Sequence, residues 1–206
     1  LESAQHILLD SQSIRNELVD MFPVTAEKTT VAPLGCSSRF HPRSHHELQS
    51  KLAHLNLNVG QYLLCVGTLE PRKNLLCAAR IVQILRERHF PHARLDIVGR
   101  IGWVEDHQLL ASCPGVYIHG YQNTSEVRRF LNQAHAFINT SHSEGLGLPL
   151  LEAQHAGLMI IARDIPIFHE VLAASGLLFD DQKLIESSDR IAAAFASNDW
   201  LSDHRS

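Results

Sequence analysis

The chain has 206 residues, of which 45% are hydrophobic and 19% are charged, and its formal net charge is -4. This composition is typical of a globular protein with one core, and the slightly acidic balance gives no support for nucleic acid as a partner. No apolar run approaches the roughly 18 residues of a membrane-spanning helix, and the first residues lack the basic start and long apolar stretch that are typical of a signal peptide. We therefore expect a cytoplasmic protein.

Metal and disulfide chemistry have little support. The four cysteines are too far apart for a zinc knuckle or a redox pair, so we expect free thiols. The fourteen histidines are scattered without the spacing of a metal motif, and no Asp-x-Asp pair occurs. We expect no metal ligands in this chain.

The first sixty residues differ in pattern from the rest. We expect a strand over His6–Leu9, a helix capped by Ser11 that runs to about Phe22, and a strand over Thr29–Ala32. A connection rich in proline and polar residues follows. The interpretation is a remnant of a preceding domain over residues 1–34, a connection over 35–60, and a Rossmann-like domain over 61–206.

From Tyr62 onward, short apolar runs alternate with longer amphipathic segments, which predicts βα units on a parallel sheet. The fold class is therefore α/β, with a Rossmann-like doubly wound sheet. The expected strands are Tyr62–Val66, Leu95–Val98, Val116–Ile118, Ala136–Asn139, Met159–Ala162 and Leu177–Phe179. The expected helices are Asn74–Arg88, Val104–Ala111, Ser125–Gln133, Leu150–Ala156, Ile167–Ala173 and Leu184–Ala196.

Small or polar residues follow the expected strands. They are Gly67-Thr68, Gly99-Arg100, His119-Gly120, the stretch from Thr140 to Gly147, and Arg163-Asp164. Open α/β sheets bind ligands in the crevice beyond the carboxyl ends of their strands. One cleft is therefore expected to gather these residues.

Arg72 and Lys73 are two cations at an expected helix start. The helix dipole disfavours positive charge there by roughly 0.3–1 kcal/mol each, so an anion held by both side chains and free backbone N–H groups would account for them. A diphosphate suits a guanidinium fork beside a mobile ammonium group. The alternative is that Glu70 neutralises one cation while both long side chains extend into water.

Glu144 and Glu152 bracket a glycine loop that opens a helix. Gly145 and Gly147 let the backbone approach a ligand, and Pro149 suits the first helical position, which puts Glu152 in the first turn. A carboxylate there can accept from the two hydroxyls of a ribose, although acidic residues are also favoured at helix starts. Glu144 lies at a strand end, where it can hold a sugar hydroxyl.

Two common phosphate-binding motifs are excluded. Leu150 occupies the third glycine position of a Gly-x-Gly-x-x-Gly fingerprint, and no Gly-Lys-Ser/Thr loop occurs. Dehydrogenase and P-loop functions are therefore not supported.

Four motifs, in order, resemble family 4 of the retaining glycosyltransferases, also called group 1. They are Gly67-x-x-Glu-Pro-Arg-Lys-Asn74, Val98-Gly-Arg-x-Gly-Trp103, Glu144-Gly-Leu-Gly-Leu-Pro-Leu-Leu-Glu-Ala153 and Asp164-Ile-Pro-Ile-Phe-His-Glu-Val171. The resemblance covers about residues 29–180 and implies a GT-B enzyme, in which two Rossmann-like domains face a cleft. This chain resembles the C-terminal, donor-binding half, and its motifs are similar to bacterial surface-polysaccharide enzymes, including mannosyltransferases.

The resemblance implies a role for each matching residue. Arg72 and Lys73 would bind the donor diphosphate, Glu152 the ribose and Glu144 the transferred sugar, so that Glu144, Arg72 and Lys73 would carry the catalysis. The other donor-binding candidates are Gly67, Thr68, Gly99, Arg100, Gly120, Tyr121, Gly145, Leu146, Gly147 and Leu148.

Four residues near this cleft have weaker expectations. Arg100 and Tyr121 are equally compatible with solvated loop positions, and Trp103 is expected to pack in the structure instead of stacking on a base. Glu170 is expected on a helix near the rim of the cleft.

The implied activity is retaining transfer from a nucleotide-diphosphate sugar to a saccharide or lipid-linked acceptor. GDP-mannose is the favoured donor, with UDP- and dTDP-sugars as alternatives, and no cofactor is obligatory. Two other functions stay open: a nucleotide-sugar-binding module without catalysis, and a nucleotide-sugar epimerase of the GT-B type. An epimerase needs acid and base residues at the sugar ring, so the motif set favours the transferase.

Most of the family's acceptor domain has no counterpart in this chain, which also stops before the family's long terminal helix. We therefore expect a fragment that binds donor but transfers no sugar alone. The full-length enzyme is expected in the cytoplasm, with peripheral contact to the inner face of the membrane.

Overall fold

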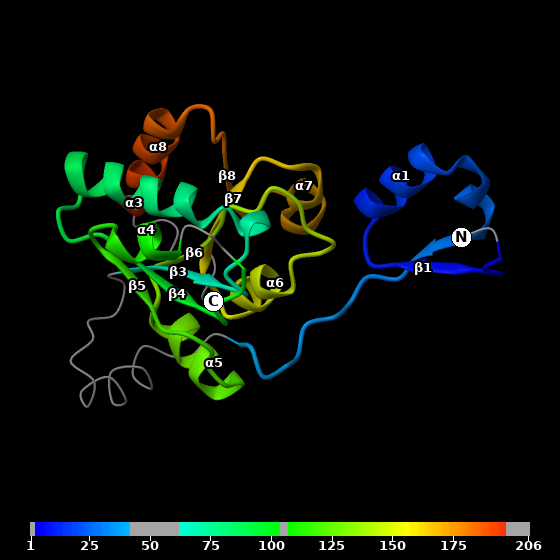
Figure 1. Cartoon of the computed structure of the whole chain (residues 1–206), viewed down its shortest axis with the longest axis horizontal. Helices are drawn as coiled ribbons and strands as arrows, with labels where there is room; N and C mark the ends of the chain where they lie inside the picture. The colour runs from blue at the N-terminus through cyan, green and yellow to red at the C-terminus, as the bar shows by residue number, and fades with distance from the viewer. Residues whose placement is uncertain (1–2, 42–61, 104–106, 197–206) are drawn as a thin grey trace.

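The structure, a computed structural model, describes residues 3–41, 62–103 and 107–196. Within these residues, six parallel strands form the main sheet, in the order β5-β4-β3-β6-β7-β8 (Figure 1). They are β3 (Tyr62–Val66), β4 (Arg94–Val98), β5 (Val116–Ile118), β6 (Ala136–Asn139), β7 (Met159–Arg163) and β8 (Leu177–Phe179). Strands are added outward from β3 in one direction and then, from β6 onward, in the other, as in doubly wound nucleotide-binding sheets.

The central strands are almost wholly buried. Every residue of β6 is buried, as are all but the last residues of β3 and β7. Continuous apolar strands of this kind are typical of parallel sheets covered on both faces. Leu63 of β3 pairs with Leu95 of β4 on one side and with Ala136 of β6 on the other, so β3 lies at the centre of the sheet.

Helices cover both faces of the sheet. Ile81 and Leu85 pack with Ile191 in one core, and Leu131, Leu150 and Phe168 lie in the other. Figure 1 shows α3 and α8 above the sheet and α5 below it. The helices are α3 (Leu75–Arg88), α4 (His107–Ser112) and α8 (Leu184–Ala196) around the first core, and α5 (Thr124–Gln133), α6 (Leu148–His155) and α7 (Pro166–Leu172) around the second.

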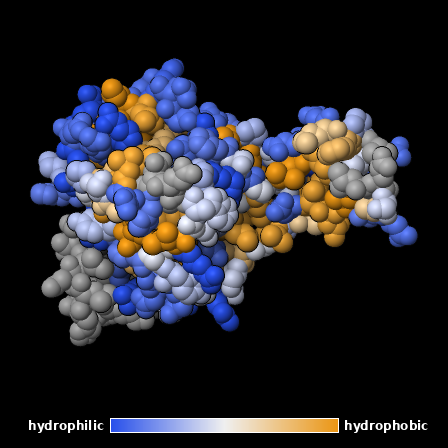
Figure 2. All heavy atoms as spheres, viewed as in Figure 1, coloured by the Kyte–Doolittle hydropathy of each residue, from blue (hydrophilic) through white to orange (hydrophobic). Residues whose placement is uncertain are grey.

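A smaller N-terminal unit precedes this sheet. Its strands β1 (Ile7–Leu9) and β2 (Thr29–Val31) pair in parallel and are joined by α1 (Gln12–Met21) and the 3-10 helix η1 (Pro23–Lys28). Hydrophobic residues gather on the surface of this unit (Figure 2), including Leu8, Met21 and Phe22, which are 69%, 71% and 43% exposed. Helix α1 contacts α7 of the larger unit.

The expected elements are present, with small differences at their ends. The strands β4 and β7 each extend over one more residue, Arg94 and Arg163, than expected. Most of the expected connection, residues 42–61, and the start of the expected helix Val104–Ala111 lie outside the described residues. The domain boundaries therefore stay a prediction. None of the described helices has the length and apolar character needed to span a bilayer.

Helix α6 begins two residues earlier than expected. Gly147 takes the left-handed conformation, with φ at 84°, and its carbonyl accepts from Leu150 and Leu151. This cap starts the helix at Leu148, so Pro149 is the second helical residue and Glu152 lies beyond the first turn. The expectation of a first-turn acid favoured by the helix dipole is therefore wrong, because the glycine loop closes sooner than its sequence indicated.

Candidate functional site

The carboxyl ends of β3 and β6 bring four charged side chains together, which we call the ion cluster: Glu70, Arg72, Lys73 and Glu144. Lys73 Nζ lies 2.6 Å from Glu144 Oε1, and Arg72 Nη1 lies 2.8 Å from Glu144 Oε2. Arg72 Nη2 donates to Glu70 Oε1 at 2.6 Å. The prediction that these cations and Glu144 share one cleft agrees with this geometry, and the formal charges of the cluster cancel.

The two loops that carry the cluster are joined by hydrogen bonds to the backbone carbonyls of Arg72 and Lys73. Thr140 Oγ1 donates to the Lys73 carbonyl at 2.8 Å, and the His142 N–H donates to the Arg72 carbonyl at 2.8 Å. These bonds link the end of β6 to the loop after β3, although the two segments are far apart in the sequence. The charged side chains are therefore held in register by the main chain beneath them.

Arg72 and Lys73 were expected beside the start of a helix at Asn74, and the structure places them shortly before α3. They lie in a separate 3-10 turn, η2 (Pro71–Lys73), which ends at Asn74 in the left-handed conformation with φ at 48°. Asn74 separates this turn from α3. In this structure the positive charges of Arg72 and Lys73 are balanced by the carboxylates of the ion cluster. An anion at the start of a helix is not needed to account for them.

The members of the ion cluster differ in exposure. The side chains of Glu144 and Lys73 are 7% and 12% exposed, whereas that of Arg72 is 41% exposed. Burial alone would raise the pKa of Glu144, but hydrogen bonds and charge from Lys73, with help from Ser141 and Arg72, outweigh it and lower the pKa below its usual value. Glu144 is therefore a stable anion, and Arg72 is the member that can reach a ligand. The alternative that both cations extend into water does not hold for Lys73.

The glycine loop presents backbone to the cleft. Leu146 turns its side chain inward and is 7% exposed, while Leu148 is 42% exposed at the start of α6. The Gly145 carbonyl accepts from Ser11 Oγ at 2.8 Å, so the N-terminal unit touches this loop. A Cβ on Gly145 would lie 3.3 Å from Asp10 Oδ2. A side chain at position 145 would therefore require the Asp10 carboxylate to shift.

Glu152 lies apart from the ion cluster, on the second turn of α6. In the part of the chain that the structure describes, its half-buried carboxylate makes no hydrogen bond and no ion pair. Burial raises its pKa above the usual value. The pKa of the Cys36 thiol is also raised, first by the burial of Cys36 itself and second by the negative charge of Glu152. A ligand that donates hydrogen bonds would relieve this cost, so the ribose contact stays a prediction with a physical motive.

The other expected strand ends meet at the same edge of the sheet. The Gly99 N–H donates to the Gly120 carbonyl at 2.9 Å, and the Gly67 N–H donates to Val98. A Cβ on Gly99 would lie 1.7 Å from the Gly67 carbonyl oxygen. These glycines therefore allow the backbones of neighbouring loops to touch, which is a packing role beside the predicted ligand contact. Thr68 is half-buried on the same loop.

Arg100 and Tyr121 form a pair near the surface. The guanidinium carbon of Arg100 lies 4.9 Å from the centre of the Tyr121 ring, which belongs to a side chain that is 64% exposed. This contact is a cation–π interaction between loop residues. Trp103 was expected to pack, and this is wrong, because the residue is 70% exposed.

A second charged group was missed from the sequence. Asp96 is fully buried in β4 and accepts two hydrogen bonds from Arg94 at 2.7 Å, and His119 Nε2 lies against the same carboxylate. The signal was available, because residues two apart on a strand share a face. This group holds His119, which directly follows β5, next to Gly120 and Tyr121, two of the predicted donor-binding residues.

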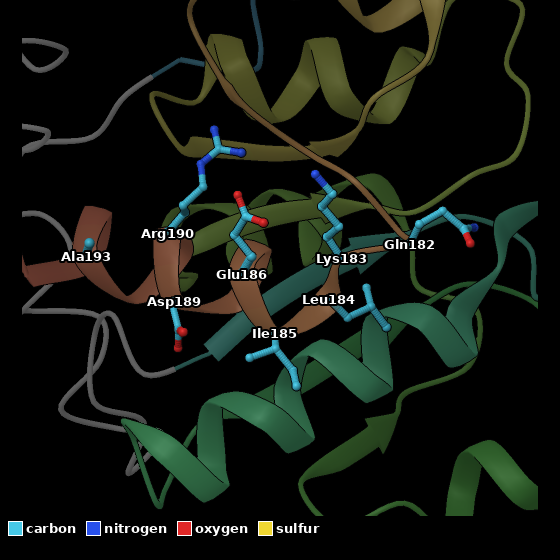
Figure 3. A pocket seen from close by; sticks show the side chains of 8 residues that line it. All are labelled: Gln182, Lys183, Leu184, Ile185, Glu186, Asp189, Arg190 and Ala193. Atoms are coloured by element: carbon cyan, nitrogen blue, oxygen red, sulfur yellow. The ribbon is translucent and has the colours of Figure 1, made fainter.

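Two hollows are relevant to the site. A pocket of about 380 Å³ has Arg72, Glu144 and Gly145 on one wall and Ser13 and Ile14 of α1 on the other. A larger open hollow of about 690 Å³ runs along α8 (Figure 3). None of the predicted site residues lines the larger hollow, so the smaller pocket is the candidate site.

Residues 51–205 match the protein family described as "Glycosyl transferases group 1". O-antigen chain mannosyltransferase B of Escherichia coli is 30% identical over 205 residues, which cover 97% of this chain and 54% of that protein. O-antigen chain mannosyltransferase RfbU of Salmonella typhimurium is 23% identical over 196 residues, which cover 91% of this chain and 51% of that protein. The chain thus spans about half the length of the curated relatives it matches.

Solved structures share the fold. Alr3699/HepE of Anabaena, in complex with UDP and glucose, aligns with a TM-score of 0.80 at 17% identity, over 96% of this chain and 55% of that chain. WaaG, a glycosyltransferase involved in lipopolysaccharide biosynthesis, aligns with a TM-score of 0.76 at 18% identity, over 96% and 56%. The expected α/β fold of GT-B type is confirmed. Since the family match covers most of the sequence, the chain belongs to the glycosyl transferases group 1 and is a glycosyltransferase domain.

Proposed function

We propose that the cleft beside the ion cluster binds a nucleotide-diphosphate sugar, and that the chain is the donor-binding part of a retaining glycosyltransferase. The observation that carries this proposal is the meeting of Arg72, Lys73 and Glu144 between β3 and β6. The reversal of strand order at this point is where open α/β sheets bind their ligands. The glycine loop adds a backbone that a ligand can approach closely.

The ion cluster has a physical route to diphosphate binding. Arg72 donates to Glu70, Glu144 and the Ser143 carbonyl, and its guanidinium is the exposed member. A diphosphate replaces these acceptors on the exposed side, and Glu144 then turns from counter-ion to acceptor for a hydroxyl of the transferred sugar. As the sugar leaves, both cations stabilise the charge that develops on the diphosphate. Glu152 accepts from the ribose.

The donor we favour is GDP-mannose, because two of the relatives are named O-antigen chain mannosyltransferases. UDP- and dTDP-sugars are the alternatives. The acceptor is a saccharide or lipid-linked saccharide of a bacterial surface polysaccharide, and the full enzyme meets it at the inner face of the membrane. Transfer needs the acceptor hydroxyl held in a closed, dry cleft, so this chain binds donor without transferring sugar by itself.

The donor is identified by a thermal-shift panel of GDP, UDP, dTDP and ADP, each with and without its sugar. A nucleotide at 100 times its dissociation constant stabilises the folded chain by about 2.7 kcal/mol. We expect GDP and GDP-mannose to give the largest shifts. If none of the nucleotides shifts the melting temperature, the proposal of a donor site is contradicted. Sugar transfer by the chain alone would contradict the proposal that it binds donor without transferring sugar.

The binding site is tested with Arg72→Ala/Lys73→Ala. We expect the thermal shift with nucleotide to disappear in this variant. The control Arg80→Ala/Lys183→Ala also removes one arginine and one lysine, but from exposed positions, and should retain the thermal shift. Because the first variant leaves the buried Glu144 without its two cations, Arg72→Ala alone serves as a second test that keeps the Lys73 pair. Unchanged nucleotide affinity in both would favour the non-catalytic module.

A further inference from the structure

The first turn of α1 is capped by a residue from the far end of the chain. The N–H groups of Gln12 and Ser13 donate to the two carboxylate oxygens of Glu170, each at 2.8 Å. Glu170 belongs to α7 and lies 158 positions after Gln12 in the sequence. Helix N-termini carry unpaired N–H groups and partial positive charge, so a carboxylate there is favoured twice.

The same turn of α1 reaches the glycine loop. Ser11 is fully buried, and its Oγ accepts from Ile14 N–H at 3.2 Å and donates to the Gly145 carbonyl at 2.8 Å. Gly145 follows directly after Glu144, the anion of the ion cluster. The N-terminal unit is therefore fastened to the larger unit at two points, on α7 and on the loop that carries Glu144.

These two fastenings border the candidate pocket. Helix α1 contributes Ser13, Ile14 and Glu17 to its wall, and the start of α7 contributes Ile165, Pro166 and Ile167. Because α1 is attached to both α7 and the glycine loop, its position sets the width of the pocket. Loss of either attachment would let this wall move while the cations after β3 stay in place.

We propose that Glu170 and Ser11 are positioning residues that clasp α1 against the glycine loop and so hold the sugar side of the donor site in its binding geometry. Neither residue touches the donor: Glu170 acts through the first turn of α1, and Ser11 acts through Gly145. The diphosphate side depends on Arg72 and Lys73, which the clasp does not contact. This inference rests on the proposed donor site.

The test uses Glu170→Gln in the full 206-residue chain. Glu186→Gln is the matched control, because Glu186 is exposed on α8 beside Lys183 and Arg190, in the hollow away from the site (Figure 3). Ser11→Ala removes the second attachment, and Ser11→Thr keeps the hydroxyl. The measurements are amide hydrogen exchange of Gln12 and Ser13 by NMR, and the dissociation constants of GDP and GDP-mannose.

We expect Glu170→Gln to speed exchange of both amides about tenfold or more, since a charge-assisted cap is lost. GDP-mannose should lose affinity more than GDP does, and a variant that was merely less stable would not change this ratio. Ser11→Ala should change the same ratio, and Ser11→Thr should restore it. Glu186→Gln should leave every value unchanged.

Two results would overturn the inference. If amide exchange in Glu170→Gln is unchanged, Glu170 does not hold α1 and the clasp is contradicted. If exchange is faster but the ratio of the two dissociation constants is unchanged, the positioning role is contradicted. If the wild-type chain binds neither GDP nor GDP-mannose, the proposed function fails and the positioning role fails with it. The amide exchange still decides whether the clasp exists, so the two failures are distinguishable.

Discussion

Glu144 and Glu152 lie on one loop-to-helix segment, yet their surroundings are opposite. Glu144 is buried among Lys73, Arg72 and Ser141, and its pKa is lowered. Glu152 is half-buried without a hydrogen bond or ion pair among the described residues, and its pKa is raised. Burial opposes the charged form at both positions, so the difference comes from the partners alone. In this structure Glu144 is the counter-ion of Lys73 and Arg72, whereas Glu152 has no ion pair within the described residues.

The largest loss of stability is expected for Lys73→Met, which removes the less exposed of the two cations that pair with Glu144. It leaves Glu144 buried with only the exposed Arg72 as its cation, so we expect a loss of about 3 kcal/mol in the free energy of unfolding. Urea denaturation measures this loss. Adding Glu144→Gln to Lys73→Met should restore part of the stability, and a double variant as unstable as the sum of the two single variants would contradict the pairing.

Glu144→Gln is expected to cost about 2 kcal/mol at neutral pH, because Lys73 loses its charged partner. The lowered pKa of Glu144 means that its stabilisation is present above the usual value of 4.5 and is lost as the pH falls through the folded-state pKa. The wild type and the variant should therefore converge in acid. Melting temperatures measured from neutral to acidic pH test this, and a constant difference between the two proteins would argue against the assignment.

Arg72→Ala is expected to affect ligand binding more than stability. Its side chain is 41% exposed, so we expect a stability loss of about 1 kcal/mol or less. Nucleotide affinity should fall about tenfold or more, because charge-assisted hydrogen bonds to a diphosphate are lost. Calorimetric titration with GDP measures the affinity. Arg80→Ala on α3 should change neither quantity.

The smallest effect on stability is expected at Glu152. A raised pKa means that ionisation of Glu152 costs stability, and this cost grows as the pH rises above 4.5 and is absent below it. Glu152→Gln should therefore be more stable at neutral pH, by about 0.5 kcal/mol or less. The same variant should bind GDP and 2′-deoxy-GDP with similar affinity, whereas the wild type should prefer GDP. A retained preference would exclude the ribose contact.

Most of the fold could be predicted from the sequence, because the apolar runs are short and separated by helical patterns. The strands β3, β5, β6 and β8 have the expected bounds, and Ser11 caps α1 as expected. The meeting of Arg72, Lys73 and Glu144 also followed from one rule, that the carboxyl ends of parallel strands share an edge. What these residues do with one another required the structure.

The rest depended on geometry that no local pattern carries. The left-handed conformation of Asn74 ends a separate 3-10 turn that carries the cations, and that of Gly147 starts α6 early enough to place Glu152 beyond its first turn. The bond from Gln12 to Glu170 joins residues that are 158 positions apart. Ser11 caps α1 locally, so the local pattern contains no signal for a second cap from Glu170.

The contact between Gly99 and Gly67 limits how this cleft can be redesigned. A methyl group at position 99 would overlap the Gly67 carbonyl, 1.7 Å from its oxygen, and no change of rotamer relieves a collision with backbone. A saturation library aimed at altered donor preference should therefore leave position 99 invariant. Diversity belongs at Arg100 and Tyr121, whose side chains lie at the surface and tolerate exchange without moving the strands beneath them.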